Sequence, residues 1–189
     1  MRLFIAVDPS PESISQLGDM VERLRSIAPH AKWVRSEKLH LTVVFLGEIE
    51  ESLVDPVMDA VKTVAIEHAP FALRIEGGGT FGGKKRARVL WADIRGDVSA
   101  LCSVQTDLAK RLETMGQTLE HRDYAPHLTL ARAGNPRGDE ALVRCANMLA
   151  GKSFGETTIR ELVLYRSEQS AQGAKYTALL RAPFRQELM

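Results

Sequence analysis

A short pattern of histidine, leucine, threonine and an aliphatic residue occurs twice in the chain. Residues 40–43 read His-Leu-Thr-Val, and residues 127–130 read His-Leu-Thr-Leu. The two copies are separated by close to half the chain length, and each lies in an apolar run. Because the sequence contains only five histidines, two such copies are improbable by chance. The pattern therefore predicts an internal repeat that carries chemistry.

The spacing within each copy indicates what that chemistry is. Residues i and i+2 of a strand project from the same face, so His40 shares a face with Thr42, and His127 shares one with Thr129. An imidazole has an ordinary pKa of about 6.5, so two of them can provide a general base and a general acid together near neutral pH. Threonine hydroxyls can donate hydrogen bonds to phosphate oxygens. Facing each other, these groups suit in-line displacement at phosphorus.

Other functions fit the pattern less well. A metal site needs a third ligand and usually a carboxylate, and none shares a strand face with the two histidines. Peptide hydrolysis needs a serine or cysteine nucleophile with an orienting acid, which is not evident. A module that only binds RNA or nucleotides does not require two proton-transfer groups. A phosphodiesterase acting on a small nucleotide or sugar cyclic phosphate stays open as an alternative.

The elements that position the motifs can be predicted from apolar periodicity. Strands are expected at 3–7, 39–46, 71–76, 89–94, 128–131, 158–165 and 176–180, and helices after Ser10, after Ser52, at 98–112 and at 139–149. Several strands follow one another directly, which favours an α+β architecture. On the first motif strand, parity predicts that Leu41, Val43 and Phe45 face the core. No linker divides the chain, so residues 1–189 are expected to form one compact domain.

Composition and charge limit the class of protein. There are 25 Lys and Arg against 24 Asp and Glu, which gives a formal net charge of +1. This balance excludes a globally basic coat for nucleic acid, although a local basic patch remains possible. No apolar run approaches the about 20 residues that span a membrane, and the N-terminal stretch is too short for a secretion signal. We expect a cytoplasmic, monomeric protein without a membrane partner.

Longer segments around both motifs resemble a known family. They are residues 2–8, 33–47, 126–132, 162–167 and 173–176. In this order, covering nearly the whole chain, they resemble the two-histidine phosphoesterase superfamily and, within it, the RNA 2′,3′-cyclic phosphodiesterases, also called 2′-5′ RNA ligases. The resemblance implies a bilobal, pseudo-twofold duplicated α+β fold with interleaved lobes. Two antiparallel sheets would flank a central catalytic cleft, with helices on the outside.

The resemblance also implies a reaction. It is the metal-independent and cofactor-independent hydrolysis of a terminal 2′,3′-cyclic phosphate on RNA to a 2′-phosphate, with weak reversible 2′-5′ ligation as a side activity. Carried over by position, His40 is the proton donor and His127 the proton acceptor, while Thr42 and Thr129 hold the phosphate. The partner is therefore an RNA with a cyclic phosphate end.

Two positions near the motifs need separate comment. By resemblance, Arg132 contacts the phosphate, where a guanidinium would neutralise developing charge. Strand parity points Arg132 away from the face of Thr129, so a bulge or the strand end must turn it inward. Family members often carry a lysine where this chain has Val44, so any phosphate role of that lysine is absent here.

A glycine-rich segment with basic residues is a candidate RNA contact. The run at 77–83 predicts a flexible loop, and Lys84, Lys85 and Arg86 follow it within the Gly77–Arg88 segment. Its cations could meet phosphates, and Phe81 could stack on a base. The alternative is a solvated hairpin in which the phenylalanine is tucked inward.

Overall fold

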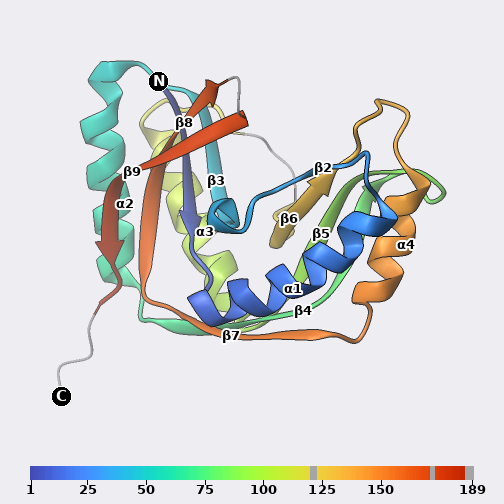
Figure 1. Ribbon diagram of the computed structural model, residues 1–189. Coiled ribbons are helices and arrows are strands. Elements are labelled where there is room, and N and C mark those ends of the chain that lie inside the picture. Colours follow the sequence, from blue (N-terminus) through green and yellow to red (C-terminus); the bar gives the residue numbers. More distant parts are fainter. Residues whose placement is uncertain (120–122, 171–172, 186–189) are drawn as a thin grey trace.

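The computed structural model describes residues 1–119, 123–170 and 173–185. Within these ranges the chain forms α-helices, β-strands and two short 3-10 turns (Figure 1). In chain order they are β1 (Arg2–Val7), α1 (Pro11–Ile27), β2 (Lys32–Trp33), η1 (Ser36–Lys38), β3 (Leu41–Glu48), η2 (Glu51–Leu53), α2 (Val54–Glu67), β4 (Phe71–Gly82), β5 (Ala87–Gly96), α3 (Val98–Thr114), β6 (His127–Arg132), α4 (Glu140–Leu149), β7 (Ser153–Ile159), β8 (Glu161–Ser170) and β9 (Gly173–Pro183).

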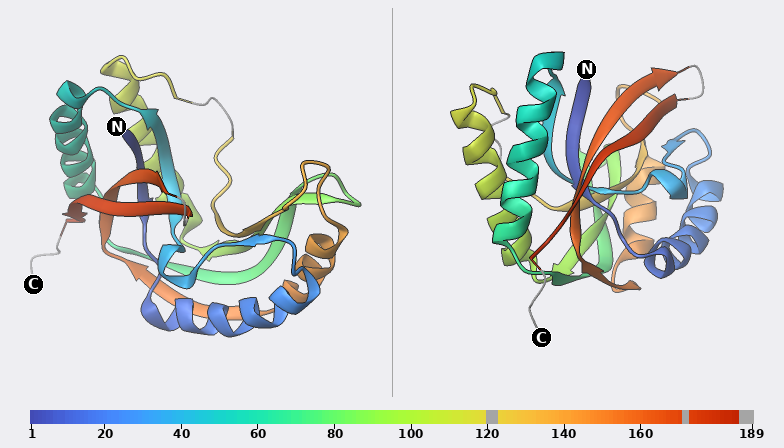
Figure 2. Two further views of the ribbon diagram at one scale, coloured as in Figure 1. Left: turned by 45° about the horizontal axis from the view of Figure 1, so that its top comes forward. Right: turned by 90° about the vertical axis from the view of Figure 1, so that its left-hand side faces the viewer.

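The strands form two antiparallel half-sheets that meet at the repeated motif. One has the order β7-β4-β5-β6 and the other β3-β1-β8-β9, while the short β2 pairs with β6. The halves are joined where Leu41 of β3 pairs with Leu128 of β6. The expected α+β fold is confirmed, with the two half-sheets continuous at this pair and curled around the space between them (Figure 2).

The two sequence halves are interleaved in space. The order β1-α1-β3-α2-β4 in the first half is matched by β5-α3-β6-α4-β8 in the second, where β7 lies between α4 and β8. However, β4 pairs with β5, and β8 pairs with β1, so each half-sheet contains strands from both halves of the sequence. This exchange explains why no linker separates the repeats, and it places both motif strands at the centre.

Helices cover the outer faces of both half-sheets. The pair α2 and α3 packs beside β3, β8 and β9, and the pair α1 and α4 packs beside β4, β5 and β7 (Figures 1 and 2). In α1, the stripe of Leu17, Val21 and Leu24 is buried, and the Ser10 hydroxyl accepts a hydrogen bond from Ser13 N at 3.2 Å, which caps the helix. None of the helices in the described ranges combines the length and apolarity needed to cross a membrane.

Both motif strands contain a bulge at the last residue of the motif. On β3, Thr42 pairs with Ala6 and Val44 with Ile5, so Val43 is the extra residue. On β6, Thr129 pairs with Trp91 and Ala131 with Leu90, which leaves Leu130 as the extra residue in the same place. Each bulge resets the alternation of side chains between the two faces of the strand.

The bulges explain why the prediction for Phe45 was wrong, and they provide the inward turn that a phosphate contact by Arg132 requires. Phe45 was expected in the core, but its side chain returns to the motif face and is 44% exposed. The prediction was wrong because simple parity does not account for the extra residue at Val43. By the same reset, Arg132 returns to the face of His127 and Thr129 instead of pointing away from it.

The glycine run is part of a strand, which overturns the predicted flexible loop at 77–83. Strand β4 continues to Gly82, and residues 78–82 pair with β5. A Cβ built on Gly79 would lie 2.5 Å from the ring of Trp91, and one on Gly78 would lie 2.6 Å from the Trp91 carbonyl oxygen. The glycines therefore allow close approach of β5 and its tryptophan, and only residues 83–86 form the connecting turn.

Candidate active site

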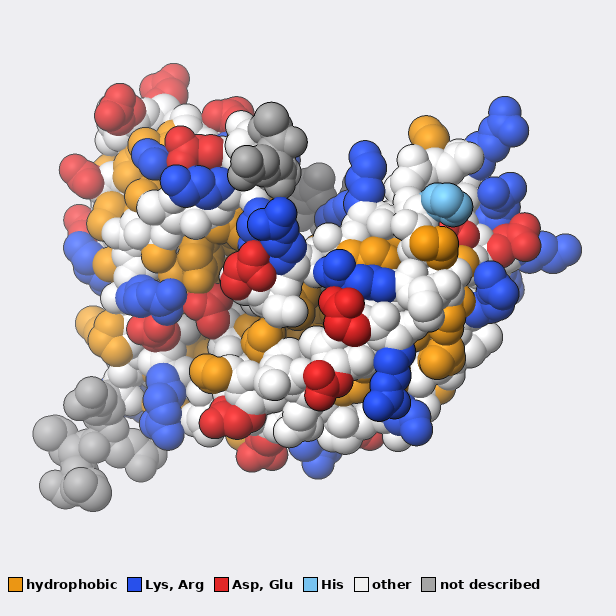
Figure 3. Space-filling model, in the orientation of Figure 1, with side chains coloured by type: hydrophobic (Ala, Val, Ile, Leu, Met, Phe, Trp, Pro, Cys, Tyr) orange, Lys and Arg blue, Asp and Glu red, His pale blue; other side chains and the backbone are white. Residues whose placement is uncertain are grey.

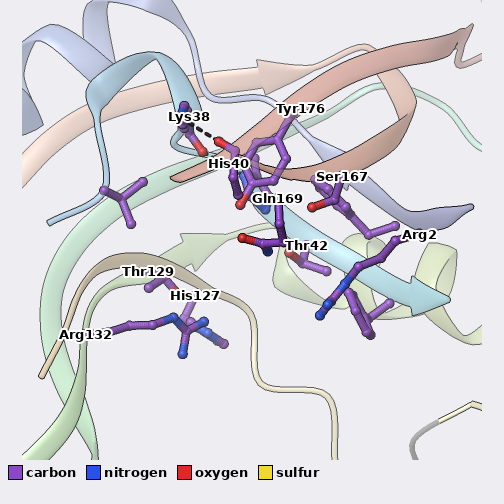
Figure 4. A pocket seen from close by; sticks show the side chains of 14 residues that line it. Arg2, Lys38, His40, Thr42, His127, Thr129, Arg132, Ser167, Gln169 and Tyr176 are labelled. Carbon is purple, nitrogen blue, oxygen red and sulfur yellow. Dashed lines mark hydrogen bonds between the residues drawn. The ribbon is translucent and has the colours of Figure 1, made fainter. Parts of the chain in front are cut away.

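A cleft lies where the two motif strands meet. Its cavity volume is about 430 Å³, and the molecular surface is notched between the two halves (Figure 3). Both histidines line it from facing half-sheets, with the polar side chains around them shown in Figure 4. Those polar residues are Arg2, Lys38, His40, Thr42, His127, Thr129, Arg132, Ser167, Gln169 and Tyr176. The structure therefore brings the predicted pair of histidines and both threonines into one space.

The two imidazoles are held in the same way. Nδ1 of His40 lies 2.8 Å from the Lys38 carbonyl oxygen, and Nδ1 of His127 lies 2.7 Å from the Ala125 carbonyl oxygen. A carbonyl oxygen only accepts hydrogen bonds, so Nδ1 of each ring carries the proton and donates it. This leaves Nε2 of each histidine available to a ligand in the cleft. The repeat thus extends to the second residue before each histidine.

His40 is packed among aromatic rings. Its ring centroid lies 4.7 Å from that of Phe4 and 5.2 Å from that of Tyr176, which meets it edge-on. Burial lowers the pKa of His40, while the hydrogen bond to the Lys38 carbonyl and the charge of Asp8 act in the opposite direction. Desolvation is the largest of these effects, so the neutral ring is favoured in the unliganded protein.

His127 has aromatic neighbours of its own. The Phe81 ring meets it edge-on with centroids 4.8 Å apart, and Trp91 packs at 5.3 Å against Phe81. Phe81 therefore supports the histidine from β4, although sequence reasoning placed it on a loop as a base platform. It is still 39% exposed.

The predicted basic residues lie elsewhere. Lys84, Lys85 and Arg86 are exposed at the turn between β4 and β5, and the cleft lining does not include them. Figure 3 shows basic side chains gathered at the end of the molecule that carries this turn. The cleft and the turn are thus separate features of one surface.

The candidate phosphate-binding residues lie together beside the histidines. Thr42 and Thr129 line the cleft from β3 and β6, and Arg132 extends from the end of β6 toward His127 (Figure 4). The hydroxyl of Tyr124 donates a hydrogen bond to the Thr42 carbonyl oxygen at 3.0 Å, which ties the first motif to the segment before the second. Three hydrogen-bond donors therefore accompany two imidazoles.

Sequence reasoning missed several residues of this cleft. Arg2 and Phe4 line it from β1 and, two residues apart, share one face of that strand. Residues 3–7 are all apolar and buried, so no alternation in the sequence marks this face. Lys38 donates from Nζ to the Ala174 carbonyl oxygen at 2.6 Å, which ties the turn before β3 to β9. A contact of this kind joins segments distant in the chain and has no local sequence signature.

The described residues contain no group of three or more His, Cys, Asp or Glu side chains arranged to hold a metal ion. The two cysteines are both free thiols: Cys102 is half-buried, and Cys145 is buried. Burial raises the pKa of Cys145 to about 11, so it stays protonated. The polar side chains that line the cleft supply imidazole, hydroxyl, guanidinium, ammonium and amide groups.

The chain is similar to several known proteins. Residues 7–91 and 98–176 match the family model of LigT-like phosphoesterases. An RNA 2′,3′-cyclic phosphodiesterase of Methanothermobacter thermautotrophicus is 29% identical over 94% of this chain and 95% of its own length. Another, from Geobacillus stearothermophilus, is 30% identical over 95% of this chain, which spans only 56% of that relative.

Solved structures show the same likeness. The protein TT0787 of Thermus thermophilus superposes with a TM-score of 0.81 at 27% identity, covering all of both chains. E. coli LigT complexed with 3′-AMP superposes with a TM-score of 0.77 at 25% identity, covering 98% of each chain. Together with the family match over most of the sequence, these findings establish that the chain belongs to the LigT-like phosphoesterase family.

Proposed function

We propose that this protein hydrolyses terminal 2′,3′-cyclic phosphates of RNA to 2′-phosphates by acid–base catalysis between His40 and His127. The observation that carries this proposal is the matched pair of imidazoles, each with Nδ1 bonded to a backbone carbonyl and Nε2 left for a ligand in one cleft. The names of the relatives, RNA 2′,3′-cyclic phosphodiesterases, support the choice of substrate.

The reaction follows from the roles of the two Nε2 atoms. Nε2 of His127 accepts a proton from water as the water oxygen bonds to phosphorus. The bond between phosphorus and the 3′ oxygen breaks, and Nε2–H of His40 donates its proton to that oxygen. The product carries a 2′-phosphate and a free 3′-hydroxyl. If a 5′-hydroxyl of another RNA replaces water, the same transfers form a 2′-5′ linkage.

The remaining residues of the cleft stabilise charge. Thr42 and Thr129 donate hydrogen bonds to the non-bridging oxygens, and Arg132 neutralises the charge that builds on them. These groups need no metal cofactor for the proposed reaction. These side chains come from β3, from His40 directly before it, and from β6.

The low pKa of His40 bears on its role as the acid. In the unliganded protein, desolvation favours the neutral ring, which cannot donate from Nε2. A bound phosphate places a negative charge beside Nε2, and an adjacent negative charge favours the imidazolium. We therefore expect His40 to take up its proton together with the anionic substrate.

The exposed cations of the β4–β5 turn extend the proposed RNA contact. Lys84, Lys85 and Arg86 form a local basic patch on a chain of nearly zero net charge. Such a patch attracts the RNA backbone without reading its sequence, and the attraction weakens with salt. Phe81 lies between this turn and His127, so an RNA end in the cleft could also touch its exposed face.

The test is the fate of the phosphoryl group. An RNA with a 2′,3′-cyclic end is incubated with the protein, and the product is analysed for the hydroxyl that keeps the phosphate. We expect a 2′-phosphate, and we expect the His40→Ala and His127→Ala variants to form none while keeping their fold. A 3′-phosphate product, or near-normal activity in either variant, contradicts the proposal. Opening of nucleoside cyclic phosphates without activity on RNA would favour the small-molecule alternative.

A further inference from the structure

The two halves of the cleft differ at one equivalent position. The fifth residue after each motif histidine is turned inward by the bulge, and it is Arg132 in the second half but Phe45 in the first. The first half therefore lacks a cation on its motif strand. The neighbouring strand supplies one, because the guanidinium carbon of Arg2 lies 5.1 Å from the centroid of the Phe45 ring. Such contacts fix a guanidinium over an aromatic face.

The charge of Arg2 is directed to the cleft, and no carboxylate of the described residues pairs with it. Its side chain extends into the pocket from the half opposite Arg132 (Figure 4). Glu48 stands across from Arg2 in the pairing of β1 with β3, but its carboxylate lies 3.4 Å from the N-terminal ammonium instead. No ion pair joins Arg2 to a carboxylate of the described residues. A free guanidinium beside a polar cavity is suited to an anion.

The position of Arg2 separates it from the reacting phosphate. Phe45 pairs with Phe4, and Thr42 pairs with Ala6, two residues further along β1. Arg132 shows the same two-residue offset from Thr129 along β5, but Arg2 lies two residues beyond Phe4 on β1. Its side chain therefore enters the cleft from a strand position about 7 Å further from its threonine than Arg132 does. Consecutive phosphates of a nucleotide chain are separated by one ribose, which is an offset of this kind.

We propose that Arg2, held against Phe45, binds the phosphodiester on the 5′ side of the terminal nucleotide. This inference rests on the proposed function and adds to it a preference for an oligonucleotide over a lone nucleotide. Arg132 then serves the reacting phosphate and Arg2 the next one. The two halves of the cleft therefore differ at the position of Phe45 and Arg132, and the RNA chain continues from the reacting phosphate on one side only.

Three substrates isolate the charge that Arg2 would bind. The first is a dinucleotide with a 2′,3′-cyclic end, the second is the same molecule with an uncharged methylphosphonate linkage, and the third is a nucleoside 2′,3′-cyclic phosphate. The wild-type protein is expected to show a higher kcat/KM on the first than on the other two. Arg2→Gln is expected to lower kcat/KM on the first by about tenfold and to leave the other two nearly unchanged.

Two further variants make the comparison specific. Phe45→Leu removes the aromatic face but keeps the charge, so it is expected to lower kcat/KM on the charged dinucleotide by about two- to fivefold. Arg23→Gln is the control for loss of one positive charge, because Arg23 is exposed on α1 outside the cleft lining. It is expected to leave all three substrates unaffected.

Two results overturn the proposal. An equal loss on all three substrates in Arg2→Gln would assign the guanidinium to the reacting phosphate or to the fold. Unchanged discrimination between the charged and methylphosphonate dinucleotides would remove Arg2 from recognition.

A binding measurement separates this inference from the proposed activity. Calorimetry compares the dinucleotide 2′-phosphate with its methylphosphonate counterpart, without any turnover. Tighter binding of the charged ligand, lost in Arg2→Gln, supports the inference. Failure of the protein to open any cyclic ester would contradict the proposed function but would leave this binding result standing. Equal binding of the two ligands by the wild-type protein overturns the inference.

Discussion

Replacing the leaving oxygen by sulfur tests which histidine is the acid. In a cyclic substrate with a bridging 3′ sulfur, the group that departs is a thiolate, and a free cysteine thiol has a pKa of about 8.5. Such a group leaves without being protonated, whereas an alkoxide does not. The sulfur substrate should therefore make the proton donor dispensable while the proton acceptor stays necessary.

The size of the effect follows from one proton transfer for each ring. Each imidazole has a single Nε2 free for the ligand, because Nδ1 is engaged by a backbone carbonyl. One positioned proton transfer contributes about 10²- to 10⁴-fold, or about 3 to 5 kcal/mol of barrier. On the oxygen substrate we expect His40→Gln and His127→Gln each to lower kcat by this factor. On the sulfur substrate we expect His40→Gln to recover to within about tenfold of wild type and His127→Gln to remain impaired.

The assay reads the released 3′ thiol with a chromogenic disulfide, and thermal melting of each variant confirms that it is folded. Recovery of His127→Gln in place of His40→Gln would reverse the two roles. Recovery of neither variant would refute the acid–base reasoning as a whole. The reversed assignment is a serious alternative, because burial lowers the pKa of His40 and so favours its neutral form, which cannot donate from Nε2, in the free protein.

Four further predictions follow from the structure. Asp8→Asn is expected to lower the pKa of His40 further, because burial already lowers it and the carboxylate of Asp8 opposes that shift; an unchanged or raised value in an NMR titration would contradict this. Because the folded-state pKa of His40 lies below its unfolded value of about 6.5, its contribution to stability is present above that pH and is lost as the pH falls through the folded value. Changing Lys84 and Lys85 together to alanine is expected to raise KM for RNA at low salt and to matter less at high salt, and an unchanged KM at low salt would exclude the turn from the RNA surface. Gly79→Ala is expected to destabilise the fold by about 1 to 3 kcal/mol in thermal denaturation, because the added Cβ would collide with the Trp91 ring. Wild-type stability would contradict this close contact between Gly79 and Trp91.

The repeated motif could be predicted from sequence because its information is local. His40 with Thr42, and His127 with Thr129, needed only strand parity and the repeat to be assigned to one cleft, and the structure places all four there. The α+β class followed from strands that succeed one another without helices. These features depend on residue type and spacing within short segments.

The bulges could not be predicted from the motif strands alone. Whether Val43 or Leu130 is skipped depends on how β1 and β5 pair with them, which is a long-range property. Parity therefore placed Phe45 in the core and directed Arg132 away from the cleft. The expected lysine position at Val44 is buried in this chain, so the cation of the first half comes from β1 instead.

The glycine run illustrates a different limit. Glycines read as a flexible loop because their backbone is permissive, but Gly78 and Gly79 are needed here for close contact with Trp91. Nothing in the run itself distinguishes close packing from flexibility. Likewise, Arg2 lies outside both histidine motifs, and its place in the cleft depends on the ring of Phe45, which was assigned to the wrong face.

The most direct measurement is a structure of the protein with a uridine–vanadate complex, which mimics the five-coordinate phosphorus of the proposed reaction. We expect Nε2 of His40 and Nε2 of His127 to form hydrogen bonds with the two apical oxygens from opposite sides. The 3′ oxygen of the ribose should be the apical oxygen next to His40. A vanadate bound with either imidazole turned away from it, or with both on one side, would contradict the account.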